Sequence, residues 1–205
     1  MPAPRPAVQR ATSSAAVPLQ PCKVVVVDDT PVNVKVLMKL LSKATSVPLL
    51  SHADGQAAVE LVEASSPTDD PLLFFMDWHM PGVCGLAATE SIRRIVAKRG
   101  GPRVHICLLT ADIEGLPGEM EKRNMSCNKV LHKAQLEDSK EEKQGCVLDI
   151  VAGKPVTFKS LQVILKAFNE QLKEQPEKSN VTPQVSSDCN NLSSDHRQAV
   201  VAAVY

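Results

Sequence analysis

Hydrophobic residues along the chain fall into short runs that are separated by segments with helical periodicity. In the run KVVVV at 23–27, four consecutive valines follow Lys23, which is typical of a strand buried on both faces of a parallel sheet. From Pro31 to Leu41 apolar residues recur every three or four positions. This spacing predicts a helix with Thr30 as its cap and Pro31 in its first turn.

The alternation of strand-like and helix-like segments continues to about residue 172. Five strands alternating with helices predict an α/β fold, in which a parallel sheet is covered by helices on both faces. Beyond the first pair, the expected strands are 48–52, 72–76, 104–109 and 146–151, and the expected helices lie near 57–62, 86–98, 117–123 and 161–168.

One internal segment fits this scheme badly. Residues 124–145 separate the fourth strand region from the fifth strand, and much of the second half of the segment is charged. An irregular connection of this length counts against a simple assignment inside a compact domain. Either the segment is an exposed insertion or the fifth strand is misplaced.

Both ends of the chain differ from the middle in composition. Residues 1–21 are rich in Ala, Ser and Pro, and residues 173–205 are largely polar and rich in Ser. We expect disordered tails at both ends and a folded domain at 22–172. A short organelle transit peptide is the alternative for the N-terminal segment, which contains arginine but no acidic residue.

Composition narrows the classes of function. The 23 basic and 23 acidic residues cancel, so we expect no direct binding of nucleic acid. No run approaches the roughly 18 apolar residues of a membrane span. The first 22 residues lack a continuous apolar segment, so we expect no secretory signal. We therefore expect no membrane association and a cytoplasmic or nuclear location. The 6 cysteines form no CxxC pair, which favours free thiols in a reducing compartment.

Polar residues whose side chains could bind a ligand or take part in a reaction lie at the carboxyl ends of four predicted strands. Asp28 and Asp29 follow the first strand, Asp77 the third, Thr110 the fourth and Lys154 the fifth. In open α/β sheets the functional site lies outside the carboxyl ends of the strands. We therefore expect these side chains to converge.

Three carboxylates in one pocket repel each other, and a hard dication with oxygen ligands removes that conflict. Mg²⁺ fits, because it takes one or two carboxylates and keeps waters or phosphate oxygens as its other ligands. Each residue alone has a structural interpretation as a helix cap or a turn. Together they predict a phosphoryl-transfer site in which a carboxylate becomes an aspartyl phosphate.

The motifs VVVVDD, FFMDWHMPG, LLTAD and GKPVTFKSL, in this order, resemble the receiver domain of two-component response regulators. The resemblance covers roughly residues 22–172. It implies a doubly wound, flavodoxin-like sheet with strand order 2-1-3-4-5. By motif, the resemblance implies that Asp77 is the phosphoacceptor, Asp28 and Asp29 hold Mg²⁺ with the backbone carbonyl of His79, Thr110 is the switch hydroxyl, and Lys154, before a cis Pro155, pairs with the phosphate.

Two departures from the family pattern concern the last strand. Receivers usually carry an aromatic residue three positions before the conserved lysine, and here that residue is Val151. The distance from Thr110 to Lys154 is also longer than usual, so Lys133 is a rival for the same role. We favour Lys154, because DIVAGKPVTFKSL reproduces the strand, the Lys-Pro pair and the closing helix together, whereas Ala134 follows Lys133.

The resemblance implies a response regulator of a His-to-Asp phosphorelay. Its donor would be a histidine-containing phosphotransfer protein or a histidine kinase. We expect no enzyme activity beyond self-catalysed phosphoryl transfer and autodephosphorylation. A plant single-domain regulator in cytokinin signalling is the nearest guess. The alternatives are a detached receiver of a hybrid histidine kinase, a transcriptional regulator and a scaffold that acts without phosphorylation.

Overall fold

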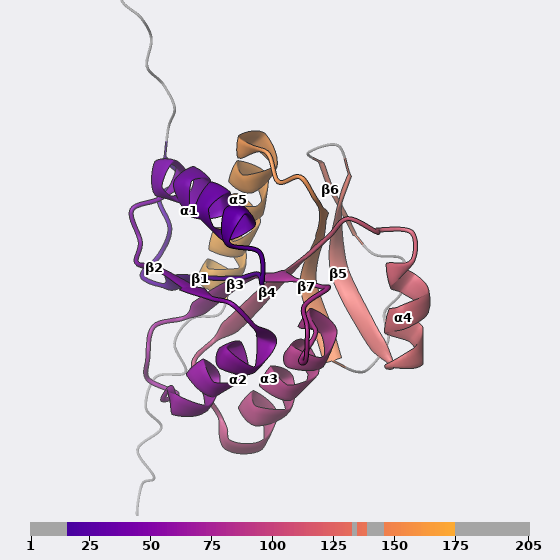
Figure 1. Ribbon diagram of the computed structural model, residues 1–205. Coiled ribbons are helices and arrows are strands. Elements are labelled where there is room, and N and C mark those ends of the chain that lie inside the picture. The colour runs from indigo at the N-terminus through magenta and orange to yellow at the C-terminus, as the bar shows by residue number, and fades with distance from the viewer. Residues whose placement is uncertain (1–15, 133–134, 139–145, 175–205) are drawn as a thin grey trace, which may run out of the picture. The chain divides into compact units, whose positions relative to one another are not determined.

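A computed structural model describes residues 16–132, 135–138 and 146–174, which form one sheet with helices on both faces (Figure 1). The sheet has seven strands in the order β2-β1-β3-β4-β7-β5-β6. The strands are β1 (Lys23–Val27), β2 (Leu49–His52), β3 (Leu72–Asp77), β4 (Val104–Thr110), β5 (Met125–His132), β6 (Gln135–Asp138) and β7 (Cys146–Gly153). The helices are α1 (Pro31–Ala44), α2 (Gly55–Ala64), α3 (Gly85–Arg99), α4 (Leu116–Lys122) and α5 (Phe158–Glu174).

The five strands predicted from the sequence are all present. β2, β1, β3, β4 and β7 pair in parallel, so β7 occupies the fifth place of the predicted order 2-1-3-4-5. The prediction of a parallel α/β sheet covered on both faces is confirmed.

Alternate side chains of each central strand enter two separate cores. Val25 and Phe74 pack under α2, α3 and α4 on one face of the sheet, whereas Val26 and Phe75 pack under α1 and α5 on the other. Both faces of β1, β3 and β4 are therefore buried, which explains their continuous apolar sequences. The polar residues Asp28, Asp77 and Thr110 lie at or directly after the carboxyl ends of these strands.

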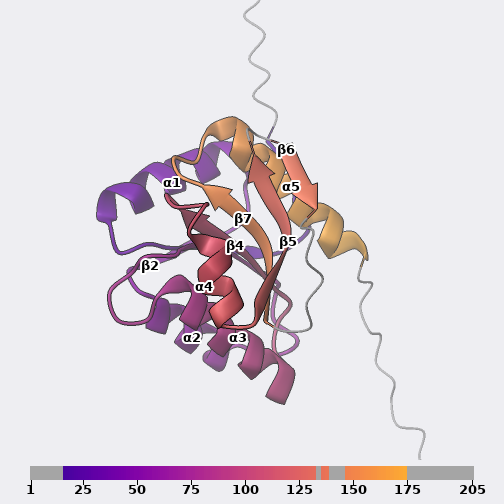
Figure 2. The ribbon, with the colours of Figure 1, turned by 90° about the vertical axis from the view of Figure 1, so that its right-hand side faces the viewer.

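The expectation that residues 124–145 are irregular was wrong for the part that the structure describes, because 125–132 and 135–138 form two strands in addition to the five predicted ones. β5 pairs in parallel with β7, and β6 pairs antiparallel with β5 (Figure 2). Without β5, the outer edge of β7 would present unpaired backbone groups, and β5 satisfies them. The fifth strand itself was placed correctly. Residues 133–134 and 139–145 lie outside the described part of the chain.

The folded domain extends beyond the predicted limits of 22 and 172. Val17 is buried, and its amide donates to the carbonyl of Ala44 at 2.7 Å. The amide of Gln20 donates to the Asn169 side chain at 3.0 Å. The assignment of residues 16–21 to a tail was therefore wrong, because apolar burial and two long-range hydrogen bonds attach residues 17–20 to the domain. The remaining predicted tails, at 1–15 and 175–205, lie outside the described residues.

Two further expectations concern disulfides and membranes. Within the described residues, the cysteines Cys22, Cys84, Cys107 and Cys127 are free. Burial raises the pKa of Cys22 to about 11 and that of Cys127 to about 12, so both thiols stay protonated near neutral pH. No helix in this part of the chain is both long and apolar enough to cross a bilayer.

Candidate functional site

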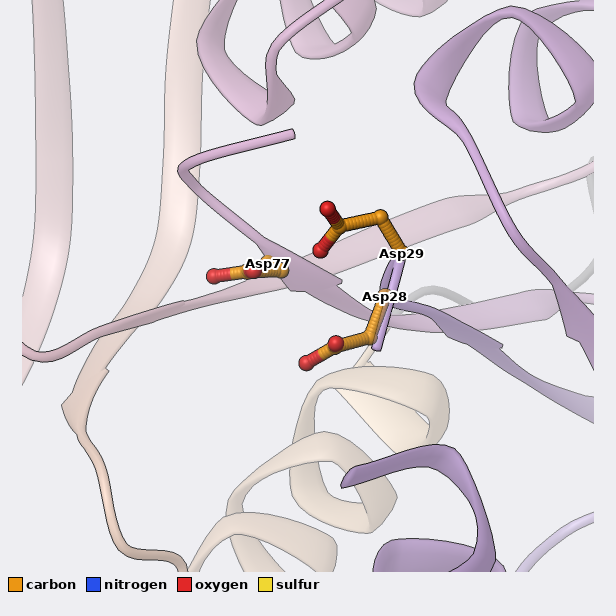
Figure 3. Close-up of side chains that lie close together, drawn as sticks. All are labelled: Asp28, Asp29 and Asp77. Atoms are coloured by element: carbon orange, nitrogen blue, oxygen red, sulfur yellow. The ribbon is translucent and has the colours of Figure 1, made fainter. Parts of the chain in front are cut away.

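Three carboxylates meet where β1 and β3 end (Figure 3). Asp28 and Asp29 directly follow β1, and Asp77 is the last residue of β3. Because β1 and β3 are neighbouring parallel strands, with Val27 paired to Met76, their carboxyl ends coincide. One oxygen from each carboxylate lies within 4.8 Å of the others. Asp28 is 4% exposed and Asp77 6%, whereas Asp29 is exposed.

Lys154 contacts two of the three carboxylates. Its Nζ atom lies 2.8 Å from Asp28 Oδ2 and 2.9 Å from Asp77 Oδ1. The Lys154–Pro155 peptide bond is cis, as the sequence predicted. Burial of the ammonium disfavours its charged form, but the hydrogen bonds to Asp28 and Asp77 outweigh this effect and raise the pKa of Lys154 above its usual value. The lysine therefore stays charged between the two aspartates.

The Asp28 carboxylate receives several further hydrogen bonds. Its Oδ1 atom accepts from the amide of Thr30 at 2.9 Å. The Asn33 side chain donates through Nδ2 to Oδ1 at 3.1 Å and to Oδ2 at 3.2 Å. Thr30 and Asn33 belong to the start of α1, so this helix holds Asp28 in place.

Thr110 is fully buried at the end of β4, directly after Leu109, which pairs with Asp77 of β3. Its hydroxyl accepts from the amide of Asp112 at 2.8 Å and donates to the carbonyl of the same residue at 3.1 Å. The Thr110 carbonyl accepts from the amide of Lys154 at 2.7 Å. The backbone thus connects Thr110 to Lys154, while the hydroxyl bonds within its own loop.

The segment after Asp77 turns back against the strand. Trp78 is 8% exposed, and its ring centroid lies 4.0 Å from that of the exposed His79. Gly82 has a φ of 73°, a conformation that favours glycine. A Cβ atom added at Gly85 would clash with the carbonyl oxygen of Asp77. The start of α3 therefore packs directly on the backbone of Asp77.

The two departures from the family pattern concern Val151 and Lys133, and the structure describes only the first of these residues. Val151 is buried in the core under α2 and α3, beside Leu108 of β4, so an aliphatic side chain occupies the place where receivers usually carry an aromatic one. Lys133, the rival of Lys154, lies outside the described residues.

The three carboxylates fit the ligand set of a magnesium ion. Their oxygens converge within 4.8 Å, and two of the three are buried where repulsion between them is strong. Lys154 offsets part of that negative charge, and the exposed Asp29 leaves one side open. Oxygen ligands with an open side are what Mg²⁺ requires, since it keeps several waters or phosphate oxygens.

Comparison with known sequences decides the family. The sequence profile of the response regulator receiver domain matches residues 24–139, which is more than half of the chain. The chain belongs to the response regulator receiver domain family. The match ends before Lys154, so the family model does not cover this lysine, and the structure shows its approach to Asp77 independently.

Curated relatives of this receiver domain are histidine kinases. Over 175 residues it is 29% identical to the sensor histidine kinase GacS of Pseudomonas protegens, a match that covers 84% of this chain and 16% of GacS. Over 105 residues it is 32% identical to the hybrid signal transduction histidine kinase I of Dictyostelium discoideum, covering 50% of this chain and 6% of that protein. The chain thus spans less than a fifth of the length of these relatives.

Solved structures with the same fold include receiver domains. One is the co-crystal structure of the Saccharomyces cerevisiae histidine phosphotransfer protein Ypd1 with the receiver domain of Ssk1. The TM-score is 0.55 at 18% identity, over 75% of this chain and 92% of the other. Another is a CheY-like receiver domain protein of Methanospirillum hungatei, with a TM-score of 0.50 at 19% identity, over 75% and 98%.

Sequence reasoning placed the acidic residues and Lys154 but missed two residues of the site. Asn33 contacts Asp28, and Gly85 allows α3 to approach Asp77. A signal existed for Asn33, since a polar residue at the third position of a helix lies near the segment that precedes the helix. Gly85 directly precedes the predicted helix at 86–98, where glycine is tolerated, so its contact with Asp77 had no signal in the sequence.

Proposed function

We propose that this chain is a phosphorelay response regulator that accepts a phosphoryl group on Asp77. The observation that carries the proposal is the placement of Lys154 between Asp28 and Asp77, beside Asp29. A buried carboxylate, two further carboxylates to hold a metal and a lysine that can neutralise phosphoryl charge are the parts that this reaction needs.

The reaction is the transfer of a phosphoryl group from a phosphohistidine. An oxygen of Asp77 attacks phosphorus, the phosphorus–nitrogen bond to the imidazole breaks, and the released imidazole takes up a proton. Mg²⁺, when bound, would orient the phosphoryl oxygens and offset their charge. Hydrolysis by water returns Asp77 to its free state, so the chain acts as a phosphoacceptor and not as an enzyme with a separate substrate.

The other residues have supporting roles in this proposal. Asp28, Asp29 and the backbone carbonyl of His79 would hold Mg²⁺ together with Asp77. Lys154 moves from Asp28 toward the phosphoryl group and pairs with it. The Thr110 hydroxyl leaves its bonds to Asp112 and donates to a phosphoryl oxygen. The charge of about −1.5 to −2 that phosphorylation adds would drive this rearrangement.

The donor must reach Asp77 across the surface around the open side of the site. Val32 and Val36 on α1 are 66% and 53% exposed, and Asn33, which lies between them in sequence, contacts Asp28. Apolar side chains in contact with water next to a charged site are suited to a protein partner. A phosphohistidine-bearing protein, either a phosphotransfer protein or a histidine kinase, is the partner that we propose, in the cytoplasm or nucleus.

Replacement of Asp77 by Asn tests the proposal. Incubation with a phosphorylated histidine phosphotransfer protein and Mg²⁺ should label the wild-type chain, and the label should be sensitive to alkali, as an acyl phosphate is. Asp77→Asn should lose the label, while Asp69→Asn, a change at an exposed loop residue, should keep it. Labelling of Asp77→Asn at the wild-type level would reject Asp77 as the acceptor.

A second candidate is the detached receiver of a hybrid histidine kinase. It is favoured by the curated relatives, which are histidine kinases. The finer proposal of a plant regulator in cytokinin signalling rests on the resemblance of the sequence motifs. The two differ in their donors. Faster labelling by plant phosphotransfer proteins than by isolated kinase domains would support the regulator, and the reverse order would support the kinase receiver.

A further inference from the structure

The start of α1 holds one ligand of the proposed metal site through a side chain that is not itself a ligand. A carboxylate can only accept hydrogen bonds, so the Asn33 amide must present its NH₂ group to Asp28. The nitrogen lies 3.1 Å from one carboxylate oxygen and 3.2 Å from the other. This nearly symmetric contact fixes the rotation of the carboxylate plane.

The remaining partners of Asp28 divide between its two oxygens. Oδ1 accepts from the amide of Thr30 at 2.9 Å, and Oδ2 accepts from Lys154 at 2.8 Å. These two bonds and the two contacts of Asn33 use all four acceptor positions of the carboxylate. A further ligand of the Asp28 carboxylate, such as a metal ion, must therefore take the place of one of these donors.

Lys154 is the donor whose position changes in the proposed reaction. When its ammonium turns to the phosphoryl group, Oδ2 of Asp28 loses its charged partner. Asn33 then remains as the side-chain donor to Asp28. Because the amide is neutral, it orients the carboxylate without competing with a cation for its negative charge.

We propose that Asn33 is a positioning residue, which holds Asp28 in its metal-binding orientation and keeps it hydrogen-bonded when Lys154 turns away. The inference rests on the proposed function, because it assigns Asp28 to the metal. Groups that orient metal ligands typically change metal affinity by about 10- to 100-fold when they are removed. An effect of this size is expected from Asn33→Ala.

Magnesium titration of the full chain tests this inference. Isothermal calorimetry and the fluorescence of Trp78, the single tryptophan of the chain, both report binding of Mg²⁺ alone. Asn33→Ala should bind Mg²⁺ about tenfold more weakly than wild type or worse. Asn128→Ala, the same substitution at an exposed residue of β5, should bind as wild type does. Because Asn33 also donates to Asp28 without metal, the rise in melting temperature from EDTA to saturating Mg²⁺ is compared, and it should be smaller for Asn33→Ala than for the other two proteins.

A second background separates positioning from a general effect on the helix. In the Lys154→Met variant the Asp28 carboxylate lacks its lysine partner. The loss of Mg²⁺ affinity caused by Asn33→Ala should therefore be larger in that variant than in wild type. Affinity of Asn33→Ala within twofold of its parent in both backgrounds would overturn the inference and leave the proposed function intact. Absence of Mg²⁺ binding by the wild-type chain would instead overturn the proposed function.

Discussion

Lys154 brings a positive charge into a cluster of three carboxylates, and this contact sets the resting state of the site. The ammonium bridges Asp28 and Asp77 at 2.8 and 2.9 Å, so two negative charges share one cation. Carboxylates at this spacing would otherwise disfavour each other's ionised form. A bound metal ion must therefore compete with a charge that Lys154 already supplies.

The ion pairs of Lys154 predict a loss of stability at alkaline pH. Folding raises the pKa of this ammonium. Its contribution is thus complete below the unfolded pKa of about 10.4 and is lost as the pH rises through the higher folded value. Without Mg²⁺, Lys154→Met should lower the free energy of unfolding by about 1 to 3 kcal/mol near neutral pH. Urea unfolding should show that the free energy of unfolding falls less steeply with rising alkaline pH in Lys154→Met than in wild type or in the exposed-site control Lys39→Met. Equal slopes would contradict the prediction.

The site residues that lie at strand ends could be predicted from the sequence, because the strand ends themselves could be located. Asp28, Asp29, Asp77 and Lys154 each follow or end an apolar run, and parallel pairing brings such positions together. Asn33 could not be placed in this way, because its contact with Asp28 depends on the path of the chain between β1 and α1. Hydrogen-bond geometry of this kind is a property of the folded loop and leaves no periodic signal in the sequence.

At the scale of elements, a buried ionic contact attaches β7 to its neighbours. Asp149 accepts from Arg93 of α3 at 2.6 Å and from the amide of Ile106 in β4 at 2.7 Å. His105 lies farther away, with Nδ1 at 3.8 Å from the carboxylate. Burial alone would raise the pKa of Asp149, but His105, Arg93 and the Ile106 amide outweigh it, and the pKa is lowered. The Asp149 carboxylate of β7 is thus hydrogen-bonded to both α3 and β4.

Replacement of Asp149 by Asn should destabilise the fold and alter its response to acid. Arg93 and His105 would face a neutral amide, and removal of one partner from a buried ion pair costs about 3 kcal/mol. Because the folded pKa is lowered, the contribution of Asp149 is present above its unfolded pKa of about 3.9 and is lost as the pH falls through the folded value. Chemical unfolding should show that the free energies of unfolding of wild type and Asp149→Asn differ at neutral pH and that the difference becomes smaller in acid. A constant difference would contradict this account.

The strands of the site were predictable, whereas β5 was not. β1, β3 and β4 are buried on both faces, so their apolar runs identify them. β5 contains Asn128 and Lys129 and follows a short helix, so its local sequence carries no strand signal. It becomes a strand because β7 offers a row of backbone partners, and tertiary context overrides local preference in sheets.

At the scale of the whole domain, the segment before β1 connects the first and last helices. Val17 is buried in the core under α1 and α5 and bonds to the end of α1 at Ala44. Gln20 bonds to Asn169 of α5. These contacts join two helices that are far apart in the sequence. Composition predicted a tail here, because a few apolar residues among prolines show no periodicity.

Truncation of Val17 to Ala tests how much this segment contributes. Loss of two buried methyl groups should lower the free energy of unfolding by about 1.5 kcal/mol. Val32→Ala removes the same atoms at a site that is 66% exposed, so its change should stay within about 0.5 kcal/mol. Equilibrium unfolding in urea measures both. Equal small changes would show that residues 17–20 add little to the stability of the domain.

The hairpin of β5 and β6 changes how the sheet meets other molecules of its kind. If β7 were the last strand, an eight-residue edge would present its backbone groups to any strand of another copy. β5 covers that edge, and within the described residues the sheet ends instead at β6, which has four residues with the sequence QLED. A short edge with acidic residues resists strand-to-strand association. The segment that looked like an interruption of the fold therefore acts as a cap against self-assembly through the sheet.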